Sequence, residues 1–237
     1  MSYHFEQGEV LLIDKPLGWT SFDVVGKIRA LLKYKVGLKK LKVGHAGTLD
    51  PLASGLLILC TGKYTKRIDE FQAQVKEYTG TFTIGATTPS YDLETEINSN
   101  SDYSYVTKEL IQNTIHKFTG TIHQLPPIYS AIKIEGKRAY EFARQQQDVE
   151  LKTREITIDE FEITNINLPE VEFRVVCSKG TYIRSLANDF GKALGCGAYL
   201  SALRRTRIGK FSISQAKDPE TLKNEILKTL EILDSEK

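Results

Sequence analysis

Hydrophobic and polar residues recur along this chain with periods that predict strands and helices. Strict alternation is typical of a strand with one buried face, and a short continuous apolar run is typical of a buried strand. Two alternating segments close together in the chain, 156–166 and 171–177, predict a hairpin. The patterns predict strands at residues 9–13, 56–59, 75–84, 156–166, 171–177, 199–207 and 210–214.

Apolar residues spaced three or four apart predict amphipathic helices. Thr20 or Ser21 is placed to cap the first helix, and Gly195 to end a later one. The helices do not alternate with strands in the regular order of a doubly wound fold, so the pattern favours the α+β class with a mixed sheet. Helices are expected after the cap at residue 20 or 21, with residues 24, 25, 28, 31 and 32 on one face, and at residues 63–71, 107–118, 183–194 and 219–233.

Composition is that of a globular protein. Of 237 residues 41% are hydrophobic, enough for a sizeable core, and no run of 18 apolar residues or signal peptide is present. We therefore expect a soluble, cytoplasmic protein. Cys60, Cys177 and Cys196 lie far apart without a CxxC pair, which predicts buried thiols and neither disulfides nor a zinc site.

Positive charge is concentrated in one part of the chain. Residues 27–67 hold ten Lys or Arg and a single acid, Asp50, although the whole chain has a net charge of only +2. A basic surface attracts polyanions, and nucleic acid is the first candidate. The alternative is that the lysine-rich stretch LLKYKVGLKKLK is a solvated loop or a frayed helix end.

Several familiar catalytic motifs are absent. GLLILCTGKYT lacks the first glycine of a phosphate loop and has Tyr64 where Ser or Thr is required. Ser54 is not part of a GxSxG turn, and the four histidines have no metal-ligand spacing. A nucleotide-binding P-loop, a serine hydrolase and a metalloenzyme are therefore disfavoured.

Asp50 stands in the stretch VGHAGTLDPLASG. One interpretation is structural, because Asp is a good N-cap and Pro51 suits the first position of a helix. That interpretation does not explain His45 between two glycines, which let the backbone turn sharply or approach a ligand. Asp50 is thus a candidate for chemistry as well as for capping.

Five motifs occur in a fixed order: KPxGxTS, GHxGxLDPxAxG, a K-x-Y strand, YSAxKxxGxxAYExAR and CSKGTYIRxLxxDxG. Together they cover most of the chain, from Leu12 to about Ser214, and they resemble the TruB family of pseudouridine synthases. The resemblance implies the pseudouridine synthase fold, a mixed and mostly antiparallel central sheet flanked by helices. It also implies isomerisation of uridine 55 in the T-loop of tRNA, without metal, nucleotide or organic cofactor.

In this resemblance Asp50 is the catalytic aspartate. It must be ionised to act on the glycosidic centre, and nearby cations favour that form. Arg184 matches the family's partner of the aspartate, so we predict that the two touch across 134 intervening residues. Lys15 falls in the N-terminal motif near the site. Attack on C1′, attack on C6 and elimination through a glycal all remain open as routes.

Four further residues are assigned to substrate by the resemblance. Tyr78 corresponds to the active-site tyrosine that stacks on the base, Tyr182 lines the same pocket, and Leu203 contacts the extruded base. His45 braces the gap that the flipped base leaves. Each has a structural alternative: Tyr78 and Leu203 as core residues of strands, Tyr182 as a packed residue at a helix start, and His45 as a structural histidine.

A segment of about residues 121–150, with a Pro-Pro break, a turn and a helix, matches the family's insertion that clasps the T-arm. Lys133, Lys137, Arg138 and Arg144 are its expected phosphate contacts. Residues 1–237 are expected to form one catalytic domain without a separate C-terminal RNA-binding domain such as PUA. The basic run of Lys33, Lys35, Lys39, Lys40 and Lys42 is then expected to carry more of the RNA binding.

The expected partner is the T-arm of tRNA, with no membrane and no obligate protein partner, and the expected state is a monomer. The competing hypothesis is an RNA chaperone that refolds tRNA on the same scaffold without catalysis. A guide-dependent ribonucleoprotein subunit is disfavoured by the spacing of the motifs. Retention of Asp50 favours an enzyme.

Overall fold

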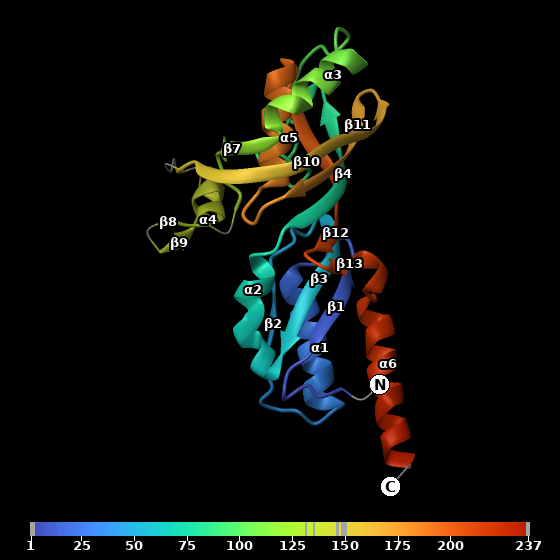
Figure 1. Ribbon diagram of the computed structural model, residues 1–237. Coiled ribbons are helices and arrows are strands. Elements are labelled where there is room, and N and C mark those ends of the chain that lie inside the picture. Colours follow the sequence, from blue (N-terminus) through green and yellow to red (C-terminus); the bar gives the residue numbers. More distant parts are fainter. Residues whose placement is uncertain (1–2, 131, 135, 146, 148–150, 236–237) are drawn as a thin grey trace. The chain divides into compact units, whose positions relative to one another are not determined.

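The structure is a computed structural model that describes residues 3–130, 132–134, 136–145, 147 and 151–235. The chain forms two compact units (Figure 1): unit 1 comprises Met1–Tyr78 and Arg204–Lys237, and unit 2 comprises Thr79–Leu203. Strands β4 (Lys76–Ile84) and β12 (Ala198–Ile208) each contribute residues to both units. The expectation of one catalytic domain stays a prediction.

Unit 1 is built on strands with the order β1-β3-β12-β4, with β2 beside β3 and β13 beside β12. Its own elements are β1 (Val10–Lys15), α1 (Ser21–Tyr34), β2 (Val43–His45), β3 (Ala53–Thr61), the 3₁₀ helix η1 (Gly62–Arg67), α2 (Ile68–Gln72), β13 (Phe211–Ser212), the 3₁₀ helix η3 (Ile213–Gln215) and α6 (Pro219–Ser235).

Strand β3 is the centre of unit 1 because both of its faces are buried. Leu57 and Leu59 pack into a cluster with residues of α1, β1 and α6, while Leu56, Ile58 and Cys60 pack into a second cluster with Phe71 and Ile208. Burying one such leucine contributes about 1.5–3 kcal/mol. A strand covered on both sides is held rigidly, and the segments attached to its ends are held with it.

The start of α1 resolves the capping question that the sequence left open. Thr20 is the N-cap: its hydroxyl accepts from the backbone of Asp23, and the Asp23 carboxylate accepts from the backbone of Thr20, which completes a capping box. Ser21 is buried instead and has a different role, described below.

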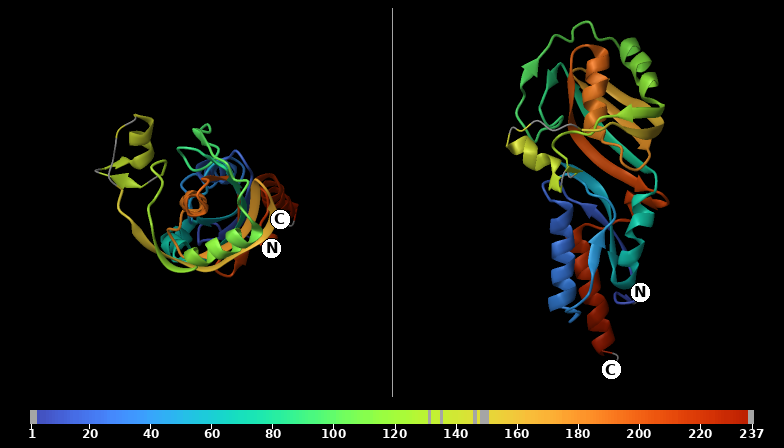
Figure 2. Two further views of the ribbon diagram at one scale, coloured as in Figure 1. Left: turned by 90° about the horizontal axis from the view of Figure 1, so that it is seen from above. Right: turned by 90° about the vertical axis from the view of Figure 1, so that its left-hand side faces the viewer.

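Unit 2 has the strand order β12-β4-β11-β10-β7. Stacked and edge-on phenylalanines from β4, β10, β11 and α5 form its core, with the Phe82 and Phe173 rings 4.1 Å apart. Helices α5 and α3 lie side by side (Figure 2). Its own elements are β5 (Ala86–Thr87), β6 (Ser99–Asn100), α3 (Lys108–Ile115), the 3₁₀ helix η2 (His116–Phe118), β7 (Gly120–Gln124), β8 (Lys133–Ile134), β9 (Lys137–Arg138), α4 (Ala139–Arg144), β10 (Arg154–Asn167), β11 (Glu170–Cys177) and α5 (Ile183–Leu194).

Most predicted elements are confirmed, including the α+β class, the β10–β11 hairpin and the left-handed Gly195 that ends α5. Three predictions were partly wrong. The helix predicted at 107–118 is α3 followed by the 3₁₀ helix η2. The helix predicted at 63–71 is a 3₁₀ turn followed by a short α-helix, and the strand predicted at 210–214 is two residues of β13 followed by η3. Both segments are short, so local capping and turn geometry outweigh the apolar pattern.

The three cysteines are buried, as predicted. Burial raises the pKa of Cys60 to about 11. Within the described ranges, no helix combines the length and the apolar character needed to cross a membrane. Of the predicted insertion, residues 131, 135, 146 and 148–150 lie outside the described residues.

Candidate active site

Asp50 lies on the short loop between β2 and β3. The loop leaves β2 through a hydrogen bond from Ala46 N to Ile58 O, and it closes with one from Ala53 N to Asp50 O, 3.0 Å long. Residues 51–52 form a turn, and Ala53 begins a strand. The interpretation of Asp50 as a helix N-cap is therefore wrong, because no helix follows it.

Three hydrogen bonds from residues at and just before the start of α1 fasten this loop. The buried hydroxyl of Ser21 accepts from Leu49 N at 2.8 Å and donates to Leu49 O at 3.1 Å. On the other side of Asp50, Gly18 N donates to Pro51 O at 2.8 Å. The residues on either side of the aspartate are thus fixed to the segment that carries the KPxGxTS motif, which gives a physical reason for the two motifs to occur together.

Lys15 is buried beneath the loop. Its ammonium donates to Pro16 O and Trp19 O, at 3.1 and 2.5 Å. Burial lowers the pKa of Lys15 to about 8; the Asp50 carboxylate opposes this shift, and the Arg205 guanidinium adds to it. The Lys15 ammonium and the Asp50 carboxylate are therefore close enough to interact electrostatically.

Arg205 is a site residue that the sequence analysis missed. Although it is only 1% exposed, its Nε donates to Leu56 O at 2.8 Å and its Nη2 to Gly47 O at 3.1 Å. Within the part of the chain that the structure describes, it has no ion pair. Neighbouring Arg204 faces the opposite way and pairs with Asp14 at 2.6 Å.

A signal for Arg205 was present in the sequence. Two adjacent arginines on a strand point to opposite faces, so one of such a pair on a buried strand faces inward. A glycine leaves room for the Arg205 backbone: Gly55 has a φ of +105°, and a Cβ there would lie 2.4 Å from the Arg205 carbonyl oxygen.

His45 ends β2, directly before the loop. Burial lowers its pKa, and the Arg205 guanidinium lowers it further, so the imidazole is neutral at pH 7. Its Nδ1 is buried and has no hydrogen-bond partner among the described residues. Lys15, His45, Asp50 and Arg205 thus form one electrostatic cluster in unit 1. Tyr78 also belongs to unit 1, where it is 9% exposed near the start of β4.

The remaining predicted residues belong to unit 2. Tyr182 is the N-cap of α5, and Gln124 clamps its backbone by donating to Tyr182 O and accepting from Tyr182 N. Leu203 is half-buried on β12. Because Asp50 and Arg184 lie in different units, their predicted contact stays a prediction.

Arg184 is buried in the first turn of α5. Its guanidinium lies 3.6 Å from the Asp92 carboxylate and donates to Ser90 O and Tyr129 O. Asp92 was missed by the sequence analysis because its segment, PSYDLETEINSNSDYS, has no apolar period and reads as an irregular loop. The guanidinium is therefore fixed in orientation by partners within its own unit.

No group of three His, Cys, Asp or Glu side chains that would suit a metal ion occurs among the residues described. The cations of the cluster that contains Asp50 are Lys15 and Arg205. This arrangement can hold a carboxylate ionised and fixed in orientation, which is what a nucleophile or a base at a sugar requires.

Comparison with known proteins gives consistent results. A family model described as "TruB family pseudouridylate synthase (N terminal domain)" matches residues 33–183, and one described as "tRNA pseudouridylate synthase B C-terminal domain" matches residues 184–235. The chain is 61% identical over 90% of its length to tRNA pseudouridine synthase B of Flavobacterium johnsoniae, and 56% identical over 92% to that of Parabacteroides distasonis; it spans 93% of each relative.

Solved structures with similar folds include a chain of a Cbf5-Nop10-Gar1 complex, with a TM-score of 0.66 and 33% identity over 88% of this chain. An archaeal box H/ACA Nop10-Cbf5 complex has a TM-score of 0.67 and 27% identity over 95%. The chain spans only 51% and 59% of those solved chains.

Proposed function

The chain belongs to the TruB family of pseudouridylate synthases, and from this we propose that it isomerises uridine to pseudouridine at position 55 in the T-loop of tRNA. The observation that carries the proposal is the position of Asp50. Asp50, which we assign as the catalytic aspartate, lies on a loop held from both sides, in one cluster with a buried lysine and a buried arginine.

The reaction is an internal rearrangement. The bond from C1′ of the ribose to N1 of uracil breaks, the base turns, and C1′ bonds to C5; the proton on C5 leaves, and N1 gains one. No oxidant, reductant or co-substrate is needed, so we propose that the chain works without a cofactor. Asp50 acts at the sugar, as nucleophile or as base, and the cations of Lys15 and Arg205 stabilise its charge.

The other site residues act on the extruded base. Tyr78 stacks on it, and Tyr182 and Leu203 complete the pocket in which it turns. His45 fills the space that the base leaves in the T-loop, a role suited to a flat, neutral imidazole next to glycine. Arg184, fixed by Asp92, pairs with Asp50 in the productive state. We propose that a monomer does this without an obligate protein partner.

Pseudouridine mapping of an unmodified tRNA transcript tests the proposal. Wild-type protein is expected to convert the T-loop uridine, while Asp50→Asn, which keeps the side-chain shape and loses the charge, is expected to give no product. Asp159→Asn, at an exposed acid on β10 outside the site, is the matched control and should react as wild type does. Product at another position would overturn the substrate assignment.

The exposed lysines of the loop before β2 favour a second function, refolding of tRNA by binding alone. Asp50→Asn separates the two functions, because neutralising one acid leaves the basic surface nearly unchanged. Its tRNA affinity should match that of wild type, and any gain in correctly folded tRNA should persist. Persistent folding activity in this variant would show that both functions exist in one chain.

A further inference from the structure

A basic hollow, called here the lysine pocket, lies in unit 1 at the end of β2 away from the Asp50 loop. Its volume is about 590 Å³. The walls are the loop between α1 and β2 and the first residues of η1, with Glu6 from the N-terminal segment. The positive charges come from the side chains of Lys39, Lys40, Lys42, Lys63 and Lys66.

The loop that supplies three of these lysines is well anchored. Leu38 and Leu41 pack against the core cluster of α1, β1 and α6. Leu38 N donates to Leu32 O at 2.9 Å, and Gly62 N donates to Lys42 O at 2.9 Å. The segment is therefore neither a frayed helix end nor a loop without core contacts. Its leucines face the core, and Lys39, Lys40 and Lys42 are left exposed.

The other two lysines are brought together by helix geometry. In a 3₁₀ helix, residues three apart lie directly above one another, so Lys63 and Lys66 of η1 share one face. Arg67, the next residue, is used differently, because its guanidinium pairs with Glu70 at 3.0 Å and lies over the Tyr64 ring. Within η1, Arg67 is therefore paired with an acid, whereas Lys63 and Lys66 face the lysine pocket.

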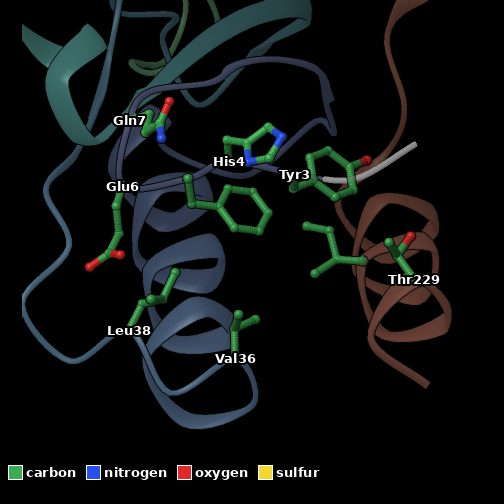
Figure 3. Close-up of a pocket in the computed structure, with 9 residues that line it drawn as sticks. Tyr3, His4, Glu6, Gln7, Val36, Leu38 and Thr229 are labelled. Atoms are coloured by element: carbon green, nitrogen blue, oxygen red, sulfur yellow. The ribbon is translucent and has the colours of Figure 1, made fainter. Parts of the chain in front are cut away.

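The charge of the lysine pocket is not balanced within unit 1. Five lysines face one acid, Glu6, a net charge of +4. None of the five lysines forms an ion pair with any residue that the structure describes. A neighbouring hollow of about 280 Å³ shares Glu6 and Leu38 but has no Lys or Arg in its lining. Figure 3 shows the Glu6 side chain there, pointing away from Tyr3 and Thr229.

We propose that the lysine pocket binds the phosphodiester backbone of the substrate RNA, at a place separate from the reacting uridine. The lining has no aromatic ring on which a base would stack, and lysine is a point charge that suits phosphate rather than a base edge. The lysine pocket therefore recognises the charge of the RNA backbone and not the base sequence. The inference rests on the proposed function, because it assumes that RNA is the substrate.

The position of the pocket fits this use. Lys42 and His45 are separated by three residues of extended chain, about 10 Å. A tRNA arm is much longer than that, so an RNA that places its uridine at Asp50 is long enough to reach the lysine pocket as well. Phosphate binding there raises affinity and fixes the register of the RNA without touching the chemical step.

The test compares two variants of equal charge. One has all five pocket lysines replaced by Gln; the control replaces five exposed lysines elsewhere with Gln, namely Lys108, Lys117, Lys152, Lys192 and Lys228. Affinity for an unmodified tRNA transcript is measured over a series of salt concentrations, and the rate of pseudouridine formation in a single turnover is measured at saturating protein.

The pocket variant is expected to bind at least about tenfold more weakly at low salt. Its salt dependence should be shallower by about 0.7–0.9 for each phosphate that the protein no longer neutralises. Its single-turnover rate should stay within about twofold of wild type. The control should keep a steeper salt dependence than the pocket variant. Equal affinity and slope in the two variants would overturn the proposal.

Two other anionic partners are distinguished by further probes. Vesicles containing phosphatidylserine and a poly-glutamate peptide are offered to the same variants. Loss of vesicle or peptide binding in the pocket variant, with tRNA affinity retained, would also overturn the proposal. The proposed function fails on a different result: if wild-type protein forms no pseudouridine in tRNA, the enzyme assignment falls, while the binding comparison still decides whether the pocket holds RNA.

Discussion

Unit 1 holds positive charge in two ways, and the contrast separates chemistry from affinity. Next to Asp50, Lys15 and Arg205 are buried and held by backbone carbonyls. In the lysine pocket, the five lysines are exposed and have long side chains with many rotamers. A buried cation acts in a low dielectric at a fixed position, whereas exposed cations act through a field that salt screens.

This difference predicts different responses to substitution. Removing a buried cation disturbs geometry and protonation at one place, and the effect should not depend on salt. Removing exposed cations should weaken binding in proportion to their number and leave the reaction rate unchanged.

The largest effect is expected for Arg205→Met. The change removes the hydrogen bonds that the guanidinium donates to the carbonyls of Leu56 and Gly47, at about 1.5–3 kcal/mol each for bonds from a charged group. For a chain of this size this lowers the melting temperature by roughly 5–15 °C. The Asp50 loop also loses a fixed support, so the single-turnover rate should fall by about 100-fold.

Calorimetry and rapid-quench assays measure the two effects of Arg205→Met. The matched control is Arg207→Met on the same strand, where the side chain is half-exposed and pairs with Glu77 at 3.5 Å. Arg205→Lys should recover part of the stability because it keeps the charge and one donor. If Arg205→Met melts and reacts as Arg207→Met does, Arg205 does not support the loop.

A smaller effect is expected from pH. Lys15 has a pKa of about 8 in the folded chain against 10.5 normally, so the unfolded chain binds more protons between these values, and stability should rise with pH across that window. The reaction should respond in the opposite direction, because deprotonation removes a cation beside Asp50.

The single-turnover rate of wild type should therefore fall as pH rises through about 8. Lys15→Met should be slower at every pH and should lack this fall. Rate profiles and thermal melts over the same pH range check both signs. If the rate of Lys15→Met falls with rising pH just as that of wild type does, the pH dependence comes from another group.

The smallest effect is expected from the double substitution of Lys33 and Lys35 by Gln. Neither residue lines the lysine pocket, and the Lys33 ammonium lies 4.6 Å from the centre of the Tyr34 ring. The tRNA affinity should stay within about twofold of wild type. Lys63 and Lys66 replaced together by Gln are the matched comparison, measured by the same titration. Equal losses in the two pairs would mean that the whole basic run binds RNA diffusely.

Much of the fold was predictable because it depends on local patterns. Alternating residues in β10 and β11 have one buried face, the apolar stripe of α5 faces the core, and Gly195 ends that helix in the left-handed conformation that glycine favours. The family was likewise predictable from the order of the motifs, whereas the role of Asp50 among them stays a prediction.

The tertiary structure decided which partner each charged side chain has. Local sequence cannot tell that Arg205 donates to Gly47, 158 residues away, or that Ser21 rather than Thr20 fastens the loop beside Asp50. Local sequence also cannot tell which of the lysines between Lys33 and Lys66 line the lysine pocket. The sequence by itself determined which residue types are present and which segments are regular. Burial and pairing depend on strands and loops from distant parts of the chain meeting in one core, and only the folded chain brings them together.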